Sequence, residues 1–139
     1  MQVLTGATGA LGAHLLSLLG QMSEHFDVAA LVRAEDDVQA KARIEESLRT
    51  RKLPSMDVAN GFQNGSRHVY ALAANLAIDN LGLTDEAYQK LLERTFLVFH
   101  VGLLSQVRLP ELICKQIAWP VNFAYGLESF VPILRGTQS

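Results

Sequence analysis

The sequence predicts an α/β fold in which a parallel sheet is covered by helices on both faces. Three observations support this prediction. Short apolar segments of strand character alternate with segments in which apolar residues recur at helical spacing. Residues 27–32 are apolar almost without interruption, as expected of a strand that is buried on both sides. A glycine-rich turn joins the first strand to the first helix, which is typical of doubly wound sheets.

Four strands are expected, each a short apolar run bounded by polar or turn-forming residues. They are placed at residues 1–4, 27–32, 68–73 and 96–99. Right-handed crossovers between consecutive parallel strands then give the strand order 3-2-1-4. Residues 55–66 contain the turn dipeptides Asn60-Gly61 and Asn64-Gly65, and they are expected to form an exposed loop.

Three helices are expected between these strands, each with one apolar face. Asp36 or Asp37 caps the second helix, which runs to about residue 51 and is stopped by Pro54. Thr84 starts the third helix, which runs to about residue 94. From about residue 112 the apolar chain is expected to be broadly helical, broken at its prolines. The residues expected to face inward in the first two helices are Leu15, Leu16, Leu18 and Leu19, then Val38, Ala42, Ile44 and Leu48.

Composition argues against several classes of protein. A net charge of −2 gives no electrostatic reason to expect a nucleic acid partner, and 49% hydrophobic residues argue against disorder. The lone Cys114 excludes a disulfide within the chain, and the four histidines lack the spacing of metal ligands. Neither a membrane-spanning run nor a signal-peptide pattern is present, so no membrane partner is expected and the protein is expected to be cytoplasmic.

Residues 5–12 read Thr-Gly-Ala-Thr-Gly-Ala-Leu-Gly, with three glycines spaced three apart directly after the first strand. Gly6 permits a tight turn, Gly9 lets the backbone approach a phosphate, and Gly12 lets the new helix pack close to the sheet. The first N–H groups of that helix are free to bind an anion. The segment therefore predicts a Rossmann-type site for the pyrophosphate of a dinucleotide, and the alternative is a glycine-rich turn without a ligand. The candidate contacts here are Gly6, Thr8, Gly9, Ala10, Leu11 and Gly12.

Three segments resemble a known family. They are residues 4–16, residues 31–34 (Leu-Val-Arg-Ala) and residues 81–88 (Leu-Gly-Leu-Thr-Asp-Glu-Ala-Tyr). Together they resemble the N-terminal part of the thioester reductase domain of nonribosomal peptide synthetase-like enzymes, carboxylic acid reductases and aminoadipate reductases, within the extended short-chain dehydrogenase/reductase superfamily. The resemblance implies NADPH as the cofactor and an acyl thioester on a carrier domain's phosphopantetheine as the substrate. Hydride transfer then releases an aldehyde, or an alcohol after a second round.

The resemblance also implies which residues recognise the phosphate that distinguishes NADPH from NADH. Arg33 stands where the family places a positive residue after the second strand, and its planar, permanently charged group suits the adenosine 2′-phosphate. Arg43 is implied as a second phosphate contact on the following helix. For both residues the alternative is a solvated surface arginine.

Further positions are implied to line the cofactor. Asn75 and Leu76 stand in place of the Asp-Leu that the family sets beside the adenine, and an Asn side chain still accepts a hydrogen bond there. His100 and Gly102 match the family's His-Asn-Gly-Ala beside the ribose and nicotinamide, although Val101 replaces the asparagine. The alternative for His100 is a packing residue at the end of a strand.

The family's catalytic groups are a Tyr-x-x-x-Lys pair and a Ser or Thr that hydrogen-bonds the reacting carbonyl, and no Tyr-x-x-x-Lys occurs here. We therefore expect residues 1–139 to form a single partial NAD(P)-binding domain that lacks the catalytic and substrate-binding part and is inactive alone. Two alternatives stay open. One is a noncatalytic nucleotide-binding or interaction module, and the other is the Rossmann half of a fatty acyl-CoA reductase.

Overall fold

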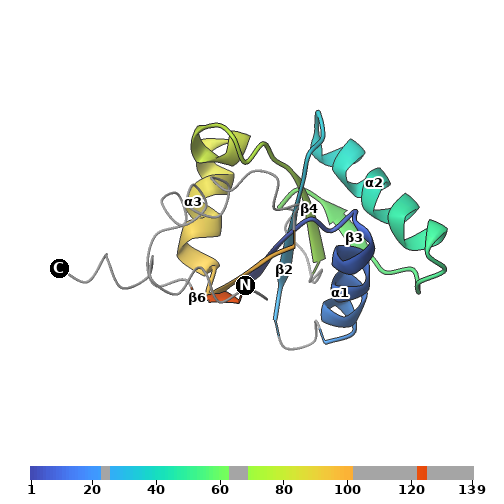
Figure 1. Cartoon of the computed structure of the whole chain (residues 1–139). Helices are drawn as coiled ribbons and strands as arrows, with labels where there is room; N and C mark the ends of the chain where they lie inside the picture. The colour runs from blue at the N-terminus through green and yellow to red at the C-terminus, as the bar shows by residue number, and fades with distance from the viewer. Residues whose placement is uncertain (23–25, 63–68, 102–121, 125–139) are drawn as a thin grey trace.

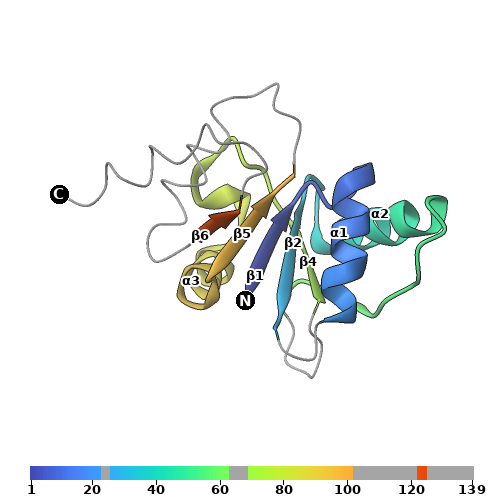
Figure 2. The ribbon, with the colours of Figure 1, turned by 60° about the horizontal axis from the view of Figure 1, so that its bottom comes forward.

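The computed structural model describes residues 1–22, 26–62, 69–101 and 122–124. Within these residues six strands form one parallel sheet in the order β3-β4-β2-β1-β5-β6 (Figures 1 and 2). The strands are β1 (Gln2–Thr5), β2 (Val28–Val32), β3 (Val58–Asn60), β4 (Val69–Ala73), β5 (Leu97–His100) and β6 (Asn122–Ala124).

The four predicted strands are present in the predicted order. They are β1, β2, β4 and β5, and each begins one residue later than expected. Their arrangement β4-β2-β1-β5 is the predicted 3-2-1-4, so the doubly wound α/β class is confirmed. All five residues of β2 are buried, which explains why this strand is apolar almost without interruption.

Two short strands extend the sheet beyond these four. Val58 and Ala59 of β3 are fully buried and pair with β4, so the expectation of an exposed loop over residues 55–66 is wrong at this strand. β6 pairs with β5, so the expectation of helical structure after residue 112 is wrong at residues 122–124. Each strand has only three residues, too few to carry a readable periodicity, and pairing with a neighbouring strand defines it.

Helices cover both faces of the sheet. α1 (Ala10–Gln21) and α2 (Asp37–Thr50) lie on one face, whereas the 3-10 helix η1 (Asp79–Gly82) and α3 (Asp85–Arg94) lie on the other (Figures 1 and 2). Successive strand residues point to opposite faces. Leu4 therefore packs in the core beneath α1 and α2, and Val3 packs in the core beneath α3.

The inward faces of α1 and α2 differ in part from those predicted. Ile44 is fully buried as expected, but Leu18 is 58% exposed and Val38 is 62% exposed. Ala42 is exposed as well. Since residues two apart lie on opposite sides of a helix, the buried Ala40 directs Val38 outward. The buried residues of α2 are Ala40, Ile44, Ser47 and Leu48.

Both ends of α2 have backbone geometry that explains its length. At its start the Asp36 side chain accepts a hydrogen bond from the Gln39 N–H at 2.7 Å, as predicted for a capping residue. At its end the Lys52 N–H donates to the Arg49 carbonyl at 3.0 Å and the Leu53 N–H donates to the Leu48 carbonyl at 2.9 Å. Lys52 itself has φ 55°, in the left-handed region. The helix thus ends in a Schellman motif, before Pro54 is reached.

A Lys52→Gly substitution is expected to stabilise the fold by about 1 kcal/mol, because glycine adopts a left-handed conformation without the steric cost borne by other residues. The free energy of unfolding in urea measures this change. Lys52→Ala is the matched control, since alanine removes the same side chain but keeps the strain. Equal stability of the glycine and alanine variants would contradict the assignment of strain to Lys52.

Candidate functional site

The chain turns sharply between β1 and α1. Gly6 has φ 77°, and its carbonyl accepts a hydrogen bond from the Gly9 N–H at 3.1 Å. Only glycine adopts that backbone angle without steric cost. The tight turn predicted at Gly6 is therefore present, and it starts α1 at the carboxyl end of β1.

Gly12 lies where α1 passes close to this turn. A Cβ atom added at Gly12 would lie 1.8 Å from the Gly6 carbonyl oxygen and 2.6 Å from the Gly6 carbonyl carbon. Both are backbone atoms that no side-chain rotation can move away. Close packing of the helix on the turn therefore requires glycine at this position. The sequence predicts close packing on the sheet, whereas the close contact in the structure is with the turn.

The N-terminus of α1 is open to an anion. No side chain caps it at Gly9, and no acidic residue lies in its first turn. Ala10 and Leu11 are exposed. The first N–H groups of a helix have no partner within the helix and carry the positive end of its dipole. A Cβ added at Gly9 would make one ordinary 3.4 Å contact with the Gly6 carbonyl oxygen, so packing within the protein does not require glycine at this position.

A cleft of about 170 Å³ adjoins this helix terminus at the carboxyl ends of β1, β2 and β4. Sequential strands run to one side of β1 through β2 and to the other side through β5, so the strand order reverses between β1 and β5, and the cleft lies on the β2 side of this point. Open parallel sheets bind ligands at this point. The lining residues are Gly6, Ala7, Thr8, Leu31, Val32, Arg33, Ala74, Leu76 and Ala77.

The two arginines predicted to recognise a phosphate come together beside the glycine-rich loop. Arg33 follows β2 directly, is exposed and lines the cleft. The Arg43 guanidinium, from α2, donates a hydrogen bond to the Arg33 carbonyl. Arg43 also lines a neighbouring groove of about 430 Å³, and Thr8 borders both the cleft and this groove. The two cations thus flank Thr8.

The predicted adenine contacts occupy different positions relative to the cleft. Leu76 lines it, together with neighbouring alanines, whereas Asn75 is exposed and does not line it. The Asn75 side-chain oxygen accepts a hydrogen bond from the Ala77 N–H at 3.1 Å, and the Asn75 N–H donates to the Leu81 carbonyl at 2.8 Å. In this geometry Asn75 shapes the turn that forms one wall of the cleft.

His100 ends β5 beside the last residue of β1. Its Nδ1 atom lies 2.5 Å from the hydroxyl of Thr5, which is 1% exposed. The strand register pairs these two residues directly. Burial lowers the pKa of His100 below its ordinary value, so the imidazole is neutral near pH 7. Gly102, the other candidate in this segment, lies outside the described residues.

This lowered pKa predicts a pH dependence of stability. Below the ordinary pKa of histidine, His100 is protonated in the unfolded chain but stays neutral in the folded chain. Acidification therefore lowers the free energy of unfolding until the pH falls below the pKa of His100 in the folded chain. Between about pH 7 and about pH 5, His100→Gln is expected to lose less free energy of unfolding than the unsubstituted chain. His14→Gln, at an exposed histidine, is the matched control. Parallel pH curves for the His100 variant and the unsubstituted chain would contradict this assignment.

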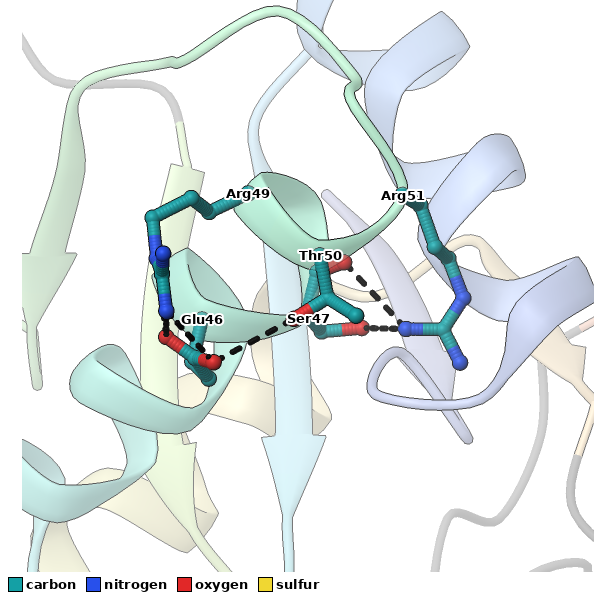
Figure 3. Close-up of polar contacts among 5 residues, drawn as sticks. All are labelled: Glu46, Ser47, Arg49, Thr50 and Arg51. Atoms are coloured by element: carbon teal, nitrogen blue, oxygen red, sulfur yellow. Dashed lines mark hydrogen bonds and ion pairs between the residues drawn. The ribbon is translucent and has the colours of Figure 1, made fainter.

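Sequence reasoning missed how α2 supports the site. The Ser47 hydroxyl donates to the Thr8 carbonyl at 2.9 Å, and the Asp37 carboxylate accepts from the Ala73 N–H at 2.7 Å. Arg51 contacts Ser47 in turn (Figure 3). A signal for Ser47 was present, because it is the polar residue on the otherwise apolar inward face of α2. The residues around Ser47 in the sequence do not indicate that its hydroxyl donates to Thr8.

The described residues contain neither a candidate metal site nor a membrane-spanning helix. In ranges 1–22, 26–62, 69–101 and 122–124, no group of three or more His, Cys, Asp or Glu side chains is placed to hold a metal ion. None of the helices in these ranges combines the length and apolar character that crossing a bilayer requires.

Comparison with known proteins identifies the family. The family model of NAD-binding domains described as "Male sterility protein" matches residues 4–113. The chain is 30% identical over 137 residues to a carboxylic acid reductase from Neurospora crassa, and the aligned region covers 99% of this chain and 10% of the relative. It is 34% identical over 100 residues to an isonitrile lipopeptide synthase from Streptomyces coeruleorubidus, and the aligned region covers 72% of this chain and 6% of that protein.

A solved structure shares the fold. The reductase domain of a nonribosomal peptide synthetase from Mycobacterium tuberculosis superposes with a TM-score of 0.65 at 22% identity, over 84% of this chain and 29% of that domain. The chain therefore spans less than a third of this solved domain and a tenth or less of the two curated relatives. On the match over residues 4–113 and these relatives, the chain belongs to the family of NAD-binding reductase domains described as male sterility protein.

Proposed function

We propose that this chain binds NADPH as the nucleotide-binding part of a thioester reductase. The observation that carries the proposal is the uncapped N-terminus of α1, which opens beside the 170 Å³ cleft with Arg33 at its rim. The crowding at Gly12 supports the fit, because it keeps the helix terminus tight against the loop where a diphosphate would bind. Residues 1–139 would then form a single nucleotide-binding unit of a larger reductase.

Each candidate residue has a role in this proposal. The N–H groups of Ala10, Leu11 and Gly12 bind the diphosphate, and Gly6, Thr8 and Gly9 shape the loop around it. Ala10 and Leu11 contribute backbone only, since their side chains are exposed.

The remaining candidates lie against the other parts of the dinucleotide in this proposal. Arg33 and Arg43 hold the 2′-phosphate by charge-assisted hydrogen bonds. Leu76 packs on the adenine, and Asn75 fixes the turn that carries Leu76. His100, next to the end of β1, lies on the side of the ribose and nicotinamide, and Gly102 is proposed as a further contact of the same part of the cofactor.

The proposed substrate is an acyl thioester on the phosphopantetheine of a carrier domain. Support comes from the relatives, one of which is named a carboxylic acid reductase, and from the solved reductase domain of a nonribosomal peptide synthetase. When bound, NADPH would supply a hydride to the thioester carbonyl carbon. Cleavage of the C–S bond would then release the phosphopantetheine thiol and an aldehyde, and a second NADPH would reduce the aldehyde to an alcohol. No Tyr-x-x-x-Lys occurs in this sequence, so we propose that the chain alone binds the cofactor without reducing a thioester.

Titration of the purified chain with NADPH and NADH, followed by nucleotide fluorescence and by calorimetry, tests the proposal. Saturable binding with preference for NADPH is expected, because Arg33 and Arg43 add favourable charge only for the 2′-phosphate. Absence of saturable binding of either nucleotide to folded protein would overturn the proposed function. Equal affinity for the two would overturn the choice of NADPH.

A further inference from the structure

Ser47 is a buried hydroxyl on the apolar face of α2. It is 7% exposed, and the other buried residues of this helix are the apolar Ala40, Ile44 and Leu48. A buried hydroxyl needs a hydrogen-bond partner, and a helical serine usually finds one on the preceding turn of its own helix. Ser47 instead donates to the Thr8 carbonyl, 39 residues away in sequence, at 2.9 Å.

This bond fixes one peptide group of the glycine-rich loop. The Thr8 carbonyl and the Gly9 N–H belong to the same planar unit. The carbonyl accepts from Ser47, and the N–H donates to the Gly6 carbonyl at 3.1 Å. The peptide is therefore held at both ends. Gly9 is the N-cap of α1, so this plane sets the direction in which the first N–H groups of the helix point.

Arg51 controls the direction of the serine proton. Its Nη1 atom donates to the Ser47 hydroxyl oxygen at 2.7 Å and to the Ser47 carbonyl at 3.2 Å (Figure 3). A hydroxyl has a single proton to donate. Because the cation occupies an acceptor position of this hydroxyl, the proton is directed to Thr8, and the nearby positive charge makes it a stronger donor.

Arg49 offers a contrast on the same helix. It pairs with Glu46, with contacts of 2.6 to 3.0 Å, and the two side chains are 76% and 59% exposed (Figure 3). Such surface pairs contribute little to stability, and among the described residues the hydrogen bonds of this pair stay within α2. Arg49 therefore matches Arg51 in chemistry and differs from it in position.

We propose that Ser47, oriented by Arg51, is a positioning residue for the diphosphate of the bound dinucleotide. This inference rests on the proposed nucleotide binding. Ser47 does not touch the ligand. It holds the Thr8–Gly9 peptide so that the helix N–H groups already face the diphosphate before it binds, which lowers the ordering cost of binding.

Binding of three nucleotides to the full 139-residue chain tests this inference. Ser47→Ala is expected to weaken NADPH and NADH alike by about fivefold, the effect of one lost hydrogen bond. Adenosine 2′-monophosphate has no diphosphate, so its affinity is expected to be unchanged. Ser47→Thr keeps the hydroxyl and is expected to restore binding. Arg51→Met is expected to weaken both dinucleotides about twofold, whereas Arg49→Met leaves them unchanged.

The outcomes separate this inference from the proposed function. If the unsubstituted chain binds neither dinucleotide, the proposed function fails and the positioning role fails with it. If it binds both and Ser47→Ala binds them equally well, the positioning role alone is overturned. A loss that extends to adenosine 2′-monophosphate indicates general loosening of the fold and also overturns it. Arg51 lies near the helix end and not in the core, so Arg51→Met provides the same comparison even if Ser47→Ala does not fold.

Discussion

Gly12→Ala is expected to destabilise the chain by roughly 1–3 kcal/mol or more, through overpacking against backbone. The added methyl would lie 1.8 Å from the Gly6 carbonyl oxygen, so α1 must move away from the loop. The gain in helix propensity from glycine to alanine, about 1 kcal/mol, offsets only part of this cost. Urea unfolding followed by circular dichroism measures the loss. The displaced helix is expected to lose dinucleotide binding as well.

Gly9→Ala is the matched control for this prediction. The same methyl at Gly9 meets its nearest atom at an ordinary 3.4 Å, and Gly9 has φ −78°, which alanine adopts freely. Alanine is a poorer N-cap than glycine, so stability is expected to fall by no more than about 1 kcal/mol, less than for Gly12→Ala. Dinucleotide affinity is expected to fall, because the methyl projects where a diphosphate approaches. If the two variants unfold at the same urea concentration, the packing role assigned to Gly12 is wrong.

Arg33→Ala is expected to weaken NADPH binding by about 10- to 100-fold and to leave NADH binding nearly unchanged. Arg33 directly follows β2 and lies at the rim of the cleft. Only NADPH carries a phosphate on its adenosine ribose with which the guanidinium group can pair. Parallel titrations of the variant with the two nucleotides measure the ratio of their affinities. Arg33→Lys is expected to recover part of the preference, because it restores the charge without the bidentate geometry.

Arg49→Ala is the control for Arg33. Both residues are exposed arginines, but Arg49 pairs with Glu46 on α2 and does not line the cleft. Its removal changes the net charge of the chain by the same amount and is expected to leave the nucleotide preference intact. An equal effect of the two substitutions would point to general electrostatic attraction, and an equal loss of NADPH and NADH in Arg33→Ala would remove the specific role of this residue.

Local patterns were sufficient to predict the elements that form this site. The turn at Gly6 and the cap of α2 at Asp36 each follow from a residue type at a fixed offset, and each is present. The order of the four predicted strands follows from the handedness of crossovers, which is independent of sequence detail. Such features depend on a few neighbouring residues, so a single sequence contains them.

The features that were missed depend on contacts between distant segments. β3 is a strand because β4 lies beside it, and its three residues have no periodicity of their own. The outward position of Val38 follows from the face that α2 presents to the sheet. The bond between Ser47 and Thr8 joins residues 39 positions apart. Propensity and spacing describe a chain locally, whereas these features are set by tertiary packing.

The contacts of α2 with both sides of the cleft have a thermodynamic consequence. Ser47 holds the loop after β1, and Asp37 holds the end of β4, so a single rigid helix spaces the two walls. The backbone around the cleft is therefore already ordered before a ligand binds. Binding then has only a small entropy cost from the protein backbone. The heat-capacity change on association should accordingly reflect buried apolar surface alone, without the larger contribution that accompanies coupled folding.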